Sequence, residues 1–322
     1  MKQLLIRRLL QSIPTLIGAS ILVFLVFTLA PGDFVTSMSG ADPNMTQERI
    51  DEIRALHGLD QPLYKQYLTW MGNLVTGNFG ESVLHRQPVT SVIETFMWNS
   101  FLIAIIVLII QWTIASVVGI FAALKQYSLF DSGVTLLVFI AMSFPSFFLG
   151  LLMLKFLAVD YQIFPLGGMR STGSTLSGWA DLWDVAKHLA LPVIVLTMLN
   201  IGSVTRYVRT NMLEVIRQDY VRTARAKGLK ERVVIFKHAL RNALLPLITL
   251  FALEIPGLFS GAIITEKIFN WPGIGRVVLD GIFLRDYPLL MGFTMLLVVL
   301  TIVANIVADL LYGVADPRVR NR

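Results

Sequence analysis

Two acidic residues, Glu254 and Asp309, lie inside stretches of the chain that are otherwise long and apolar. A carboxylate at bilayer depth is costly, so such groups usually face a water-filled cavity or a polar partner. Glu254 precedes Pro256 and Gly257, where a helix is expected to bend and expose backbone groups to a cavity. Glu254 therefore either faces a polar pathway, where it would meet a substrate's amino terminus, or it is protonated or hydrogen-bonded between helices. For Asp309, we expect a structural partner on a neighbouring helix.

Two weaker candidates for the same pathway are Asn200 and Ser203, which lie in another apolar stretch. Their side chains are small and polar, but such side chains also join helices to one another by hydrogen bonds. Pro145 predicts a kink in a third stretch, where it is as consistent with a structural role as with gating.

The sequence lacks the residue patterns of the common catalytic and metal sites. It contains no cysteine and four histidines, and no two of those histidines are four residues apart. No phosphate-binding Gly-x-x-x-x-Gly-Lys-Ser/Thr motif occurs, and no Gly-x-Ser-x-Gly nucleophile motif occurs. We therefore predict no catalytic residue, no bound metal and no cofactor held by this chain.

The elements that must position these residues are six candidate membrane-spanning helices. Of the 322 residues 55% are hydrophobic and 15% are charged, against about 25% charged in soluble domains. A span needs about 20 apolar residues, and an N-terminal run this long exceeds the apolar core of a cleaved signal peptide. The predicted fold is all-α and polytopic, with spans at 9–32, 95–124, 132–154, 188–205, 242–265 and 287–308. This composition argues against a secreted disulfide scaffold, a disordered chain and an ordinary cytosolic enzyme.

The distribution of charge predicts which segments face the cytoplasm. With six spans, segments 1–8, 125–133, 206–241 and 316–322 share one side and hold 17 Lys or Arg and 5 Asp or Glu. The opposite segments hold 10 Lys or Arg and 14 Asp or Glu. Positive residues favour the cytoplasmic side, so both termini are predicted to be cytoplasmic. The net charge of +6 is thus explained by the excess of basic residues in the segments predicted to be cytoplasmic.

Four regions follow from these spans: a first helix (1–32), an extracytoplasmic loop region (33–94), a five-helix core (95–315) and a cytoplasmic tail (316–322). In the loop region, Asn44 or Thr46 is expected to cap one amphipathic helix, which Gly58 ends. Pro62 is expected to start a second amphipathic helix. The loop region is either a lid on the membrane mouth or a docking surface for a delivery partner. A second outer loop carries Trp179 and Trp183, as at a membrane interface.

The segment 206–241 predicts a helix, a turn and a second helix at the membrane surface. The first helix is expected over 212–227, Gly228 suits the left-handed position that ends it, and Glu231 opens the second helix. The ten basic residues here either enforce topology or contact anionic lipid. Nucleic-acid binding is not expected, because the segment is tethered between two spans and lacks a core of its own.

Longer motifs carry a resemblance that covers nearly the whole chain. Residues 206–229 read RYVRTNMLEVIRQDYVRTARAKGL and residues 237–246 read KHALRNALLP. They resemble the coupling segment of binding-protein-dependent ABC importers, and specifically the B-type permease of the dipeptide/oligopeptide/nickel family. Further similar motifs are IPT (13–15), APGD (30–33), HGLDQP (57–62), GNFG (77–80), IFNWPGIGR (268–276), RDYP (285–288) and DPRVR (316–320). One departure is that the Glu-Ala-Ala triplet of the wider superfamily is Arg222-Thr223-Ala224 here, a variant typical of peptide-type permeases.

This resemblance implies a type I ABC importer permease fold in the prokaryotic cytoplasmic membrane. It implies a companion C-type permease as heterodimer partner, two cytoplasmic ATPase subunits that bind ATP and magnesium, and an extracytoplasmic solute-binding protein. The implied function is to form the translocation pathway for short peptides, with no enzymatic activity in this chain. The residues implied in coupling to the ATPases are Asp219, Arg222, Ala224, Arg225, Lys227, Gly228 and Leu229.

Three alternatives stay open at this point. The cargo of the same family could be a nickel chelate, glutathione or an opine-like solute, because a separate binding protein largely selects it. An ion-coupled secondary transporter would need more ionisable groups at the midplane and paired broken helices, which are not evident. A membrane-embedded enzyme is disfavoured because no catalytic constellation is present.

Overall fold

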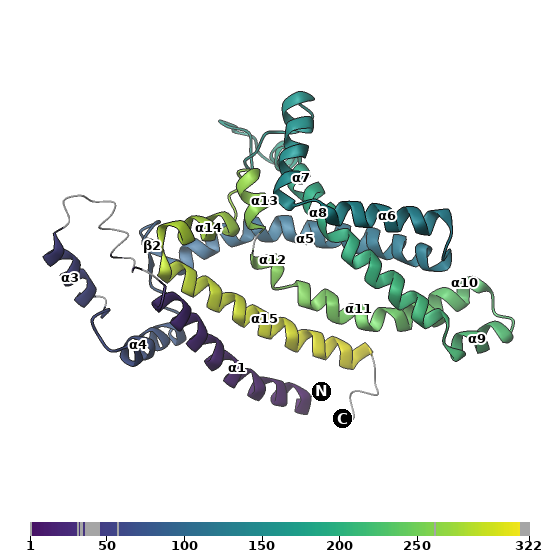
Figure 1. Ribbon diagram of the computed structural model, residues 1–322, viewed down its shortest axis with the longest axis horizontal. Coiled ribbons are helices and arrows are strands. Elements are labelled where there is room, and N and C mark those ends of the chain that lie inside the picture. The colour runs from purple at the N-terminus through teal and green to yellow at the C-terminus, as the bar shows by residue number, and fades with distance from the viewer. Residues whose placement is uncertain are drawn as a thin grey trace.

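The computed structural model describes residues 2–30, 32, 35, 46–56, 58–260 and 262–315. Most of this part of the chain is helical, which confirms the predicted fold class (Figure 1). Its only strands form a short antiparallel pair, β1 (Glu81–Ser82) and β2 (Gln87–Pro88), and the rest consists of turns and loops. Predicted motif residues Pro31, Asp33, Asn44 and His57, and the tail 316–322, lie outside the described residues.

Among the described residues, five helical segments are long and apolar enough to cross a membrane, or six if the bent pair over 129–160 is counted as one span. Four are single helices: α1 (Lys2–Thr28), α5 (Val89–Leu124), α8 (Trp179–Ile216) and α15 (Tyr287–Ala315). The fifth runs through α11 (Leu240–Glu254), α12 (Gly257–Ser260) and α13 (Ile263–Ile268). Each matches a predicted span, but α5 begins before Thr95 and α8 extends past both ends of 188–205. The predicted boundary at residue 94 therefore falls inside α5 and not at its start.

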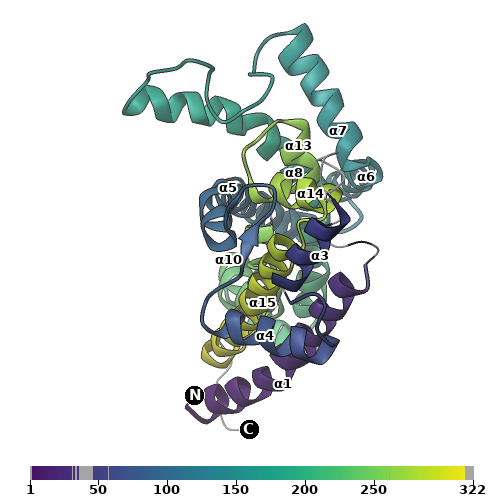
Figure 2. The same cartoon turned by 90° about the vertical axis from the view of Figure 1, so that its left-hand side faces the viewer.

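The third predicted span is not one kinked helix. It consists of α6 (Leu129–Ser143), α7 (Ser146–Met153) and the π-helical η1 (Leu154–Asp160), with a bend of 97° between the two parts. Proline lacks a backbone N–H and forces the preceding residue into extended geometry, and Phe144 has ψ 131. The expected kink at Pro145 is thus a corner, and α7 projects from the side of the bundle in Figure 2.

In the described part of the chain, the predicted inside segments and two of the three outside segments gather at opposite ends of the molecule, while the outer segment 155–187 projects from the side of the bundle (Figures 1 and 2). The first residues of α1 and the last of α15 point toward the end that carries α9 (Asp219–Ala226) and α10 (Glu231–Val233) (Figure 1). The opposite end carries α3 (Gln47–Leu56), α4 (Leu63–Val75), the strand pair and α14 (Ile274–Leu284). This separation agrees with the sorting of segments by charge.

The two helices expected in the first loop region are both present. Gly58 has a φ of +66°, so the left-handed position predicted after α3 is confirmed. Helix α4 packs on α1, where Tyr67 shares a hydrogen bond of 2.9 Å with Ser20 and its ring contacts Phe24. Neither α3 nor α4 has a fully buried residue, but Tyr67, Trp70 and Leu74 of α4 pack against the buried cluster around Phe24, and no described residue of α3 belongs to such a cluster. The first helix of the region is therefore exposed, and the second is part of the bundle.

Candidate functional site

A cavity of about 340 Å³ lies between α5, α8, α11 and α12. It forms where α11 ends at Glu254 and α12 restarts at Gly257, so the predicted helix interruption at Pro256 is confirmed. Its lining residues are Ser100, Ile103, Ala104, Val107, Leu108, Gln111, Leu196, Asn200, Ser203, Leu253, Glu254, Gly257, Leu258 and Ala262. The three residues predicted for a translocation pathway, Asn200, Ser203 and Glu254, thus border one space.

Glu254 is held in place by two neighbouring side chains of α5. Its Oε2 accepts hydrogen bonds from Gln111 Nε2 at 2.8 Å and from Trp112 Nε1 at 2.9 Å. Among the described residues, no basic side chain forms a salt bridge with Glu254. A carboxylate in a dry environment needs such donors, because desolvation without compensation is costly. The alternative of a hydrogen-bonded link between helices is therefore realised, and the same carboxylate also borders the cavity.

The wall contributed by α8 is polar but already hydrogen-bonded within its own helix. Asn200 Nδ2 donates to the Leu196 carbonyl at 2.8 Å, and Ser203 Oγ donates to the Asn200 carbonyl at 2.8 Å. Sequence reasoning missed Gln111, since a glutamine in an apolar run gives no signal of which residue it faces. Metal binding has no geometric basis in the described part of the chain, where no cluster of three His, Cys, Asp or Glu occurs.

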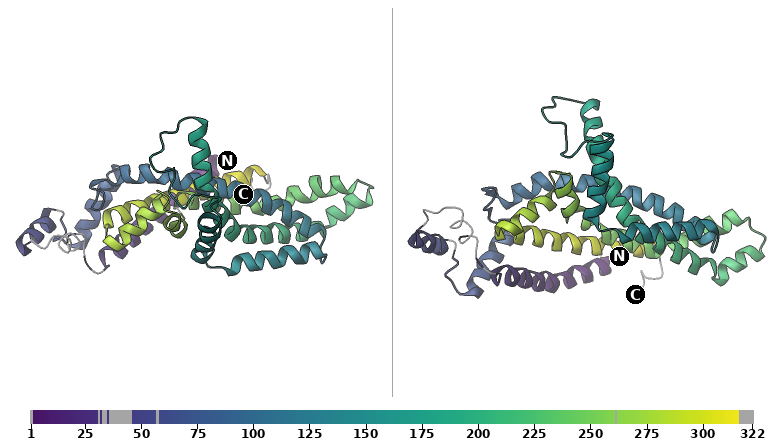
Figure 3. Two further views of the ribbon diagram at one scale, coloured as in Figure 1. Left: turned by 90° about the horizontal axis from the view of Figure 1, so that it is seen from above. Right: turned by 45° about the horizontal axis from the view of Figure 1, so that its top comes forward.

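The second candidate region is the surface segment that contains α9. The single helix expected over 212–227 is wrong, because α8 ends at Ile216 and Gln218 precedes a separate short helix. The turn that follows is confirmed: Gly228 has a φ of +73° and its N–H donates to the Arg225 carbonyl at 2.9 Å. The second predicted helix begins at Glu231 as expected and continues into the π-helical η2 (Val234–Ala239). Figure 3 shows this hairpin extending past the other helices.

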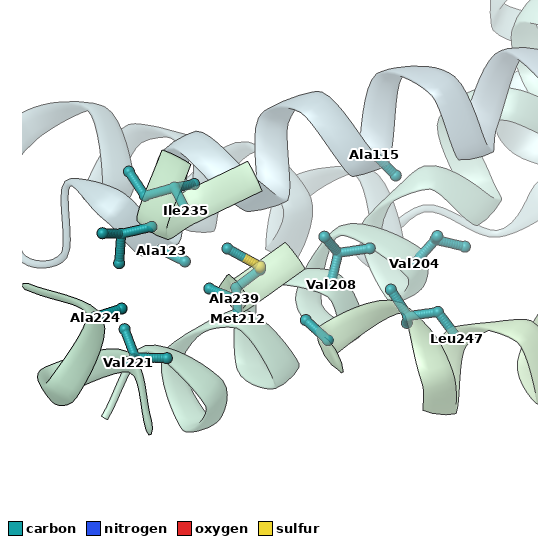
Figure 4. Close-up of a cluster of buried hydrophobic side chains, with 12 residues drawn as sticks. Ala115, Ala123, Val204, Val208, Met212, Val221, Ala224, Ile235, Ala239 and Leu247 are labelled. Carbon is teal, nitrogen blue, oxygen red and sulfur yellow. The ribbon is translucent and has the colours of Figure 1, made fainter. Parts of the chain in front are cut away.

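One face of α9 is buried in the chain's own core. Val221 and Ala224 pack with Met212, Val234 and Ile235, in a cluster that also includes residues of α5 and α11 (Figure 4). Ala224 is only 5% exposed, so its contribution to any docking surface is to seat α9 on the bundle. Helix α9 therefore packs against three membrane-spanning segments, α5, α8 and α11.

The other face of α9 is polar and exposed. Asp219 and Arg222 pair at 3.6 Å with side chains that are 96% and 71% exposed. Arg225 pairs at 2.7 Å with Glu231, across the turn at Gly228. This hydrogen-bonded pair lowers the pKa of the Glu231 carboxyl and raises the pKa of Arg225. Lys227 and Leu229 are also exposed beside the turn. Of the basic residues implied in coupling, Arg225 thus has a strong partner within its own chain.

The chain is similar along its whole length to proteins of one transport family. Residues 115–321 match the model described as "Binding-protein-dependent transport system inner membrane component". Residues 1–107 match the N-terminal model of the same kind of component. The chain belongs to this family. The resemblance to permeases of binding-protein-dependent ABC importers is therefore confirmed, and this family has the type I ABC permease fold.

Three relatives show how far the similarity extends. The oligopeptide transport system permease protein AppB of Bacillus subtilis is 43% identical over 98% of both chains. The di/tripeptide transport system permease protein DppB of Pseudomonas aeruginosa is 40% identical over 98% of both chains. The glutathione transport system permease protein GsiC of Escherichia coli is 35% identical over 98% of both chains.

The permease contains buried carboxylates that sequence reasoning missed. Besides Glu254 and Asp309, Asp131 lies in the first turn of α6 and Glu266 lies two residues before the end of the segment Pro246–Ile268. Glu266 is 1% exposed and accepts hydrogen bonds from Ser100 Oγ and from the Ala262 and Arg276 backbone N–H groups. These carboxylates sit at predicted loop edges, where an acidic residue carries no sign of burial.

Two ion pairs join helices near the end of the permease that carries α9. Arg209 of α8 donates two hydrogen bonds, at 2.6 and 2.8 Å, to the buried Asp131 of α6. Arg8 of α1 pairs with Asp309 of α15 at 2.8 Å, which confirms a structural partner for Asp309. The first pair thus joins α6 to α8, the helix that leads into α9, and the second joins α1 to α15.

Proposed function

We propose that this chain is one of two paired permeases in an ATP-driven importer of short peptides, located in the prokaryotic cytoplasmic membrane. The observation that supports this most strongly is the full-length similarity to permeases named for oligopeptide and di/tripeptide transport. A companion permease completes the pathway, a solute-binding protein delivers the peptide from outside, and two ATPase subunits bind ATP and magnesium. Hydrolysis then takes place in those subunits and not in this chain.

Within this proposal, α9 and the turn after it dock on an ATPase subunit. The helix is short, rigidly seated by Val221 and Ala224, and projects from the end of the bundle. Its exposed Asp219, Arg222 and Lys227, with Leu229 after the turn, form the outward surface. Movement of an ATPase would thus pass through a stiff element into α8 and α11, to which α9 is connected on either side.

The cavity beside Glu254 is this chain's part of the translocation pathway. Its lining is apolar apart from a few polar groups, of which Asn200, Ser203 and Glu254 are three. A pathway for peptides of varied side chains needs weak, unspecific walls, since tight binding would slow release. An apolar wall with one anchoring charge meets that need.

A second candidate cargo is glutathione, because a glutathione permease covers the chain at 35% identity. Both cargoes are short peptides with a free amino group, so the same wall would serve either. The two are separated by the binding protein that accompanies the permease.

The test is uptake by the complete transporter in proteoliposomes. We expect ATP-dependent accumulation of tritiated trialanine when the permease pair, both ATPases and the binding protein are present. If excess glutathione reduces this accumulation while the binding protein stays equally saturated, the result would favour glutathione as the cargo. A fully assembled transporter that hydrolyses ATP yet accumulates neither solute would contradict the proposed function.

A further inference from the structure

We propose that the wall formed by Glu254, Gln111 and Trp112 binds the α-ammonium group of the peptide as it passes through the cavity. This inference rests on the proposed function and adds the chemical group that the cavity recognises. Three features of the described residues carry it: one unneutralised carboxylate, a surplus of hydrogen-bond acceptors and the absence of a basic side chain from the lining.

The first feature is the orientation of the carboxylate. Both donors that reach Glu254 bond to Oε2, and they come from consecutive residues of α5. In the described part of the chain, Oε1 has no hydrogen-bond partner, while Glu254 remains partly exposed where it lines the cavity. The α5 side chains thus fix the carboxylate and leave one oxygen for a further donor.

The second feature is the balance of donors and acceptors around the cavity. Because the Gln111 amide nitrogen faces Glu254, its Oε1 is left buried without a partner among the described residues. On the α8 wall, Ser203 donates its hydroxyl to a helix carbonyl, and Asn200 donates one of its two amide N–H groups in the same way. Two acceptors of this site, Glu254 Oε1 and Gln111 Oε1, are thus left without a donor among the described residues, which suits a ligand group that only donates.

The third feature is charge. The lining contains Glu254 and no Lys, Arg or His among the described residues, so its formal charge is negative. A carboxylate end of a peptide would be repelled, whereas an ammonium group supplies the missing counter-charge and three N–H donors. The apolar walls of the cavity lower the local dielectric constant, which strengthens the attraction between the carboxylate and the ammonium group relative to water. The volume of about 340 Å³ is at the small end of ligand pockets, consistent with one end of a peptide.

The experiment uses the complete transporter in proteoliposomes, with tritiated trialanine delivered by saturating binding protein. Glu254→Gln removes the charge but keeps an oxygen that accepts from Gln111 and Trp112. We expect the maximal uptake rate to fall at least about tenfold, with assembly retained, and Glu254→Asp to restore a substantial part of it. The matched control is Asp309→Asn, which neutralises a membrane carboxylate that is remote from the cavity lining and should change uptake less than twofold.

A second readout keeps the inference testable if Glu254→Gln assembles poorly. The purified wild-type complex is irradiated with Ala-Ala-benzoylphenylalanine, with its free amino group or N-acetylated, in the absence of binding protein. We expect the free peptide to label this chain at least fivefold more than the acetylated peptide. Equal labelling by the two peptides, or unchanged uptake by Glu254→Gln, overturns the inference and leaves the peptide importer standing. Wild-type transporter that takes up no peptide contradicts the proposed function instead.

Discussion

The cavity and the surface helix α9 differ in how the chain builds them. The cavity is assembled across long separations, since Gln111 and Glu254 are 143 residues apart. The α9 hairpin is built from neighbours, with a helix, a glycine turn and an ion pair all within 219–231. One region depends on helix packing and the other on local backbone chemistry. Substitutions at the cavity should therefore act through the packing between helices, and substitutions in the α9 hairpin should act through local backbone conformation.

The largest effect is expected beneath α9, at Met212. This side chain is fully buried beneath α9 and beside α5. Met212→Ala should lower the free energy of unfolding by about 2–5 kcal/mol, because it leaves a cavity under the helix. Thermal unfolding of the purified complex in detergent measures this loss. Met142→Ala, at an exposed methionine of α6, should change stability by less than about 0.5 kcal/mol.

The next largest effect should come from the pair that ties α6 to α8. Asp131→Asn removes a buried partner of Arg209 and leaves its guanidinium undercompensated. Because Arg209 is partly exposed, the expected cost is about 1–3 kcal/mol. If unfolding midpoints of Asp131→Asn and of the Arg209→Met/Asp131→Asn double variant were both unchanged, the pair would not support the α9 end of the bundle.

A smaller stability effect with a large functional readout is expected at Gly228. Valine at a φ of +73° costs about 1–2 kcal/mol, because its β-branched side chain clashes with the backbone there. Gly228→Val should therefore deform the turn and lower ATP-driven uptake at least about tenfold. No side chain crowds either Gly228 or Gly173, and both have a φ of +73°. Gly173→Val is thus a matched control at a distant loop, and equal loss of uptake in both variants would refute a special role for the α9 turn.

The smallest effect concerns the Arg225–Glu231 pair. Since the pKa of Glu231 is lowered in the fold, its stabilisation is present above the ordinary pKa of about 4.3 and is lost as the pH falls through the lowered value. The pair is exposed, so it should contribute less than about 1 kcal/mol. Glu231→Gln should lower the unfolding midpoint slightly at pH 7, and this difference should disappear only when the pH falls below the lowered pKa of Glu231. A constant difference at every pH would show that the contribution is not electrostatic.

Much of the fold was predictable because each spanning helix is a local property of about 20 apolar residues. The same locality explains the correct glycine positions at Gly58 and Gly228, where only backbone conformation is at stake. The helix expected over 212–227 is interrupted at Arg217. The apolar spacing of the sequence continues past this residue, so the break is visible only in the tertiary structure. The corner at Pro145 was foreseen as a kink, but its angle depends on what α7 meets.

The candidate site was predictable in its members and not in its contacts. Glu254, Asn200 and Ser203 were recognisable as polar groups in apolar spans, yet nothing local reveals that they share one cavity. Gln111 and Trp112 were not recognisable, because their role appears only when α5 lies against α11. Glu266 and Asp131 were read as loop-edge charges, although the fold buries both.

By itself, the sequence determined the positions of five of the six predicted spans, the α9 turn and the family to which the chain belongs. These follow from hydropathy, charge and backbone propensity, which act over a few residues, and from motifs that span the chain. Tertiary structure alone decided which oxygen of Glu254 remains unbonded, which helices Arg209 and Arg8 join, and which face of α9 is left for a partner. Those outcomes depend on how separate helices pack, and each contact is fixed by residues that lie far apart in the chain.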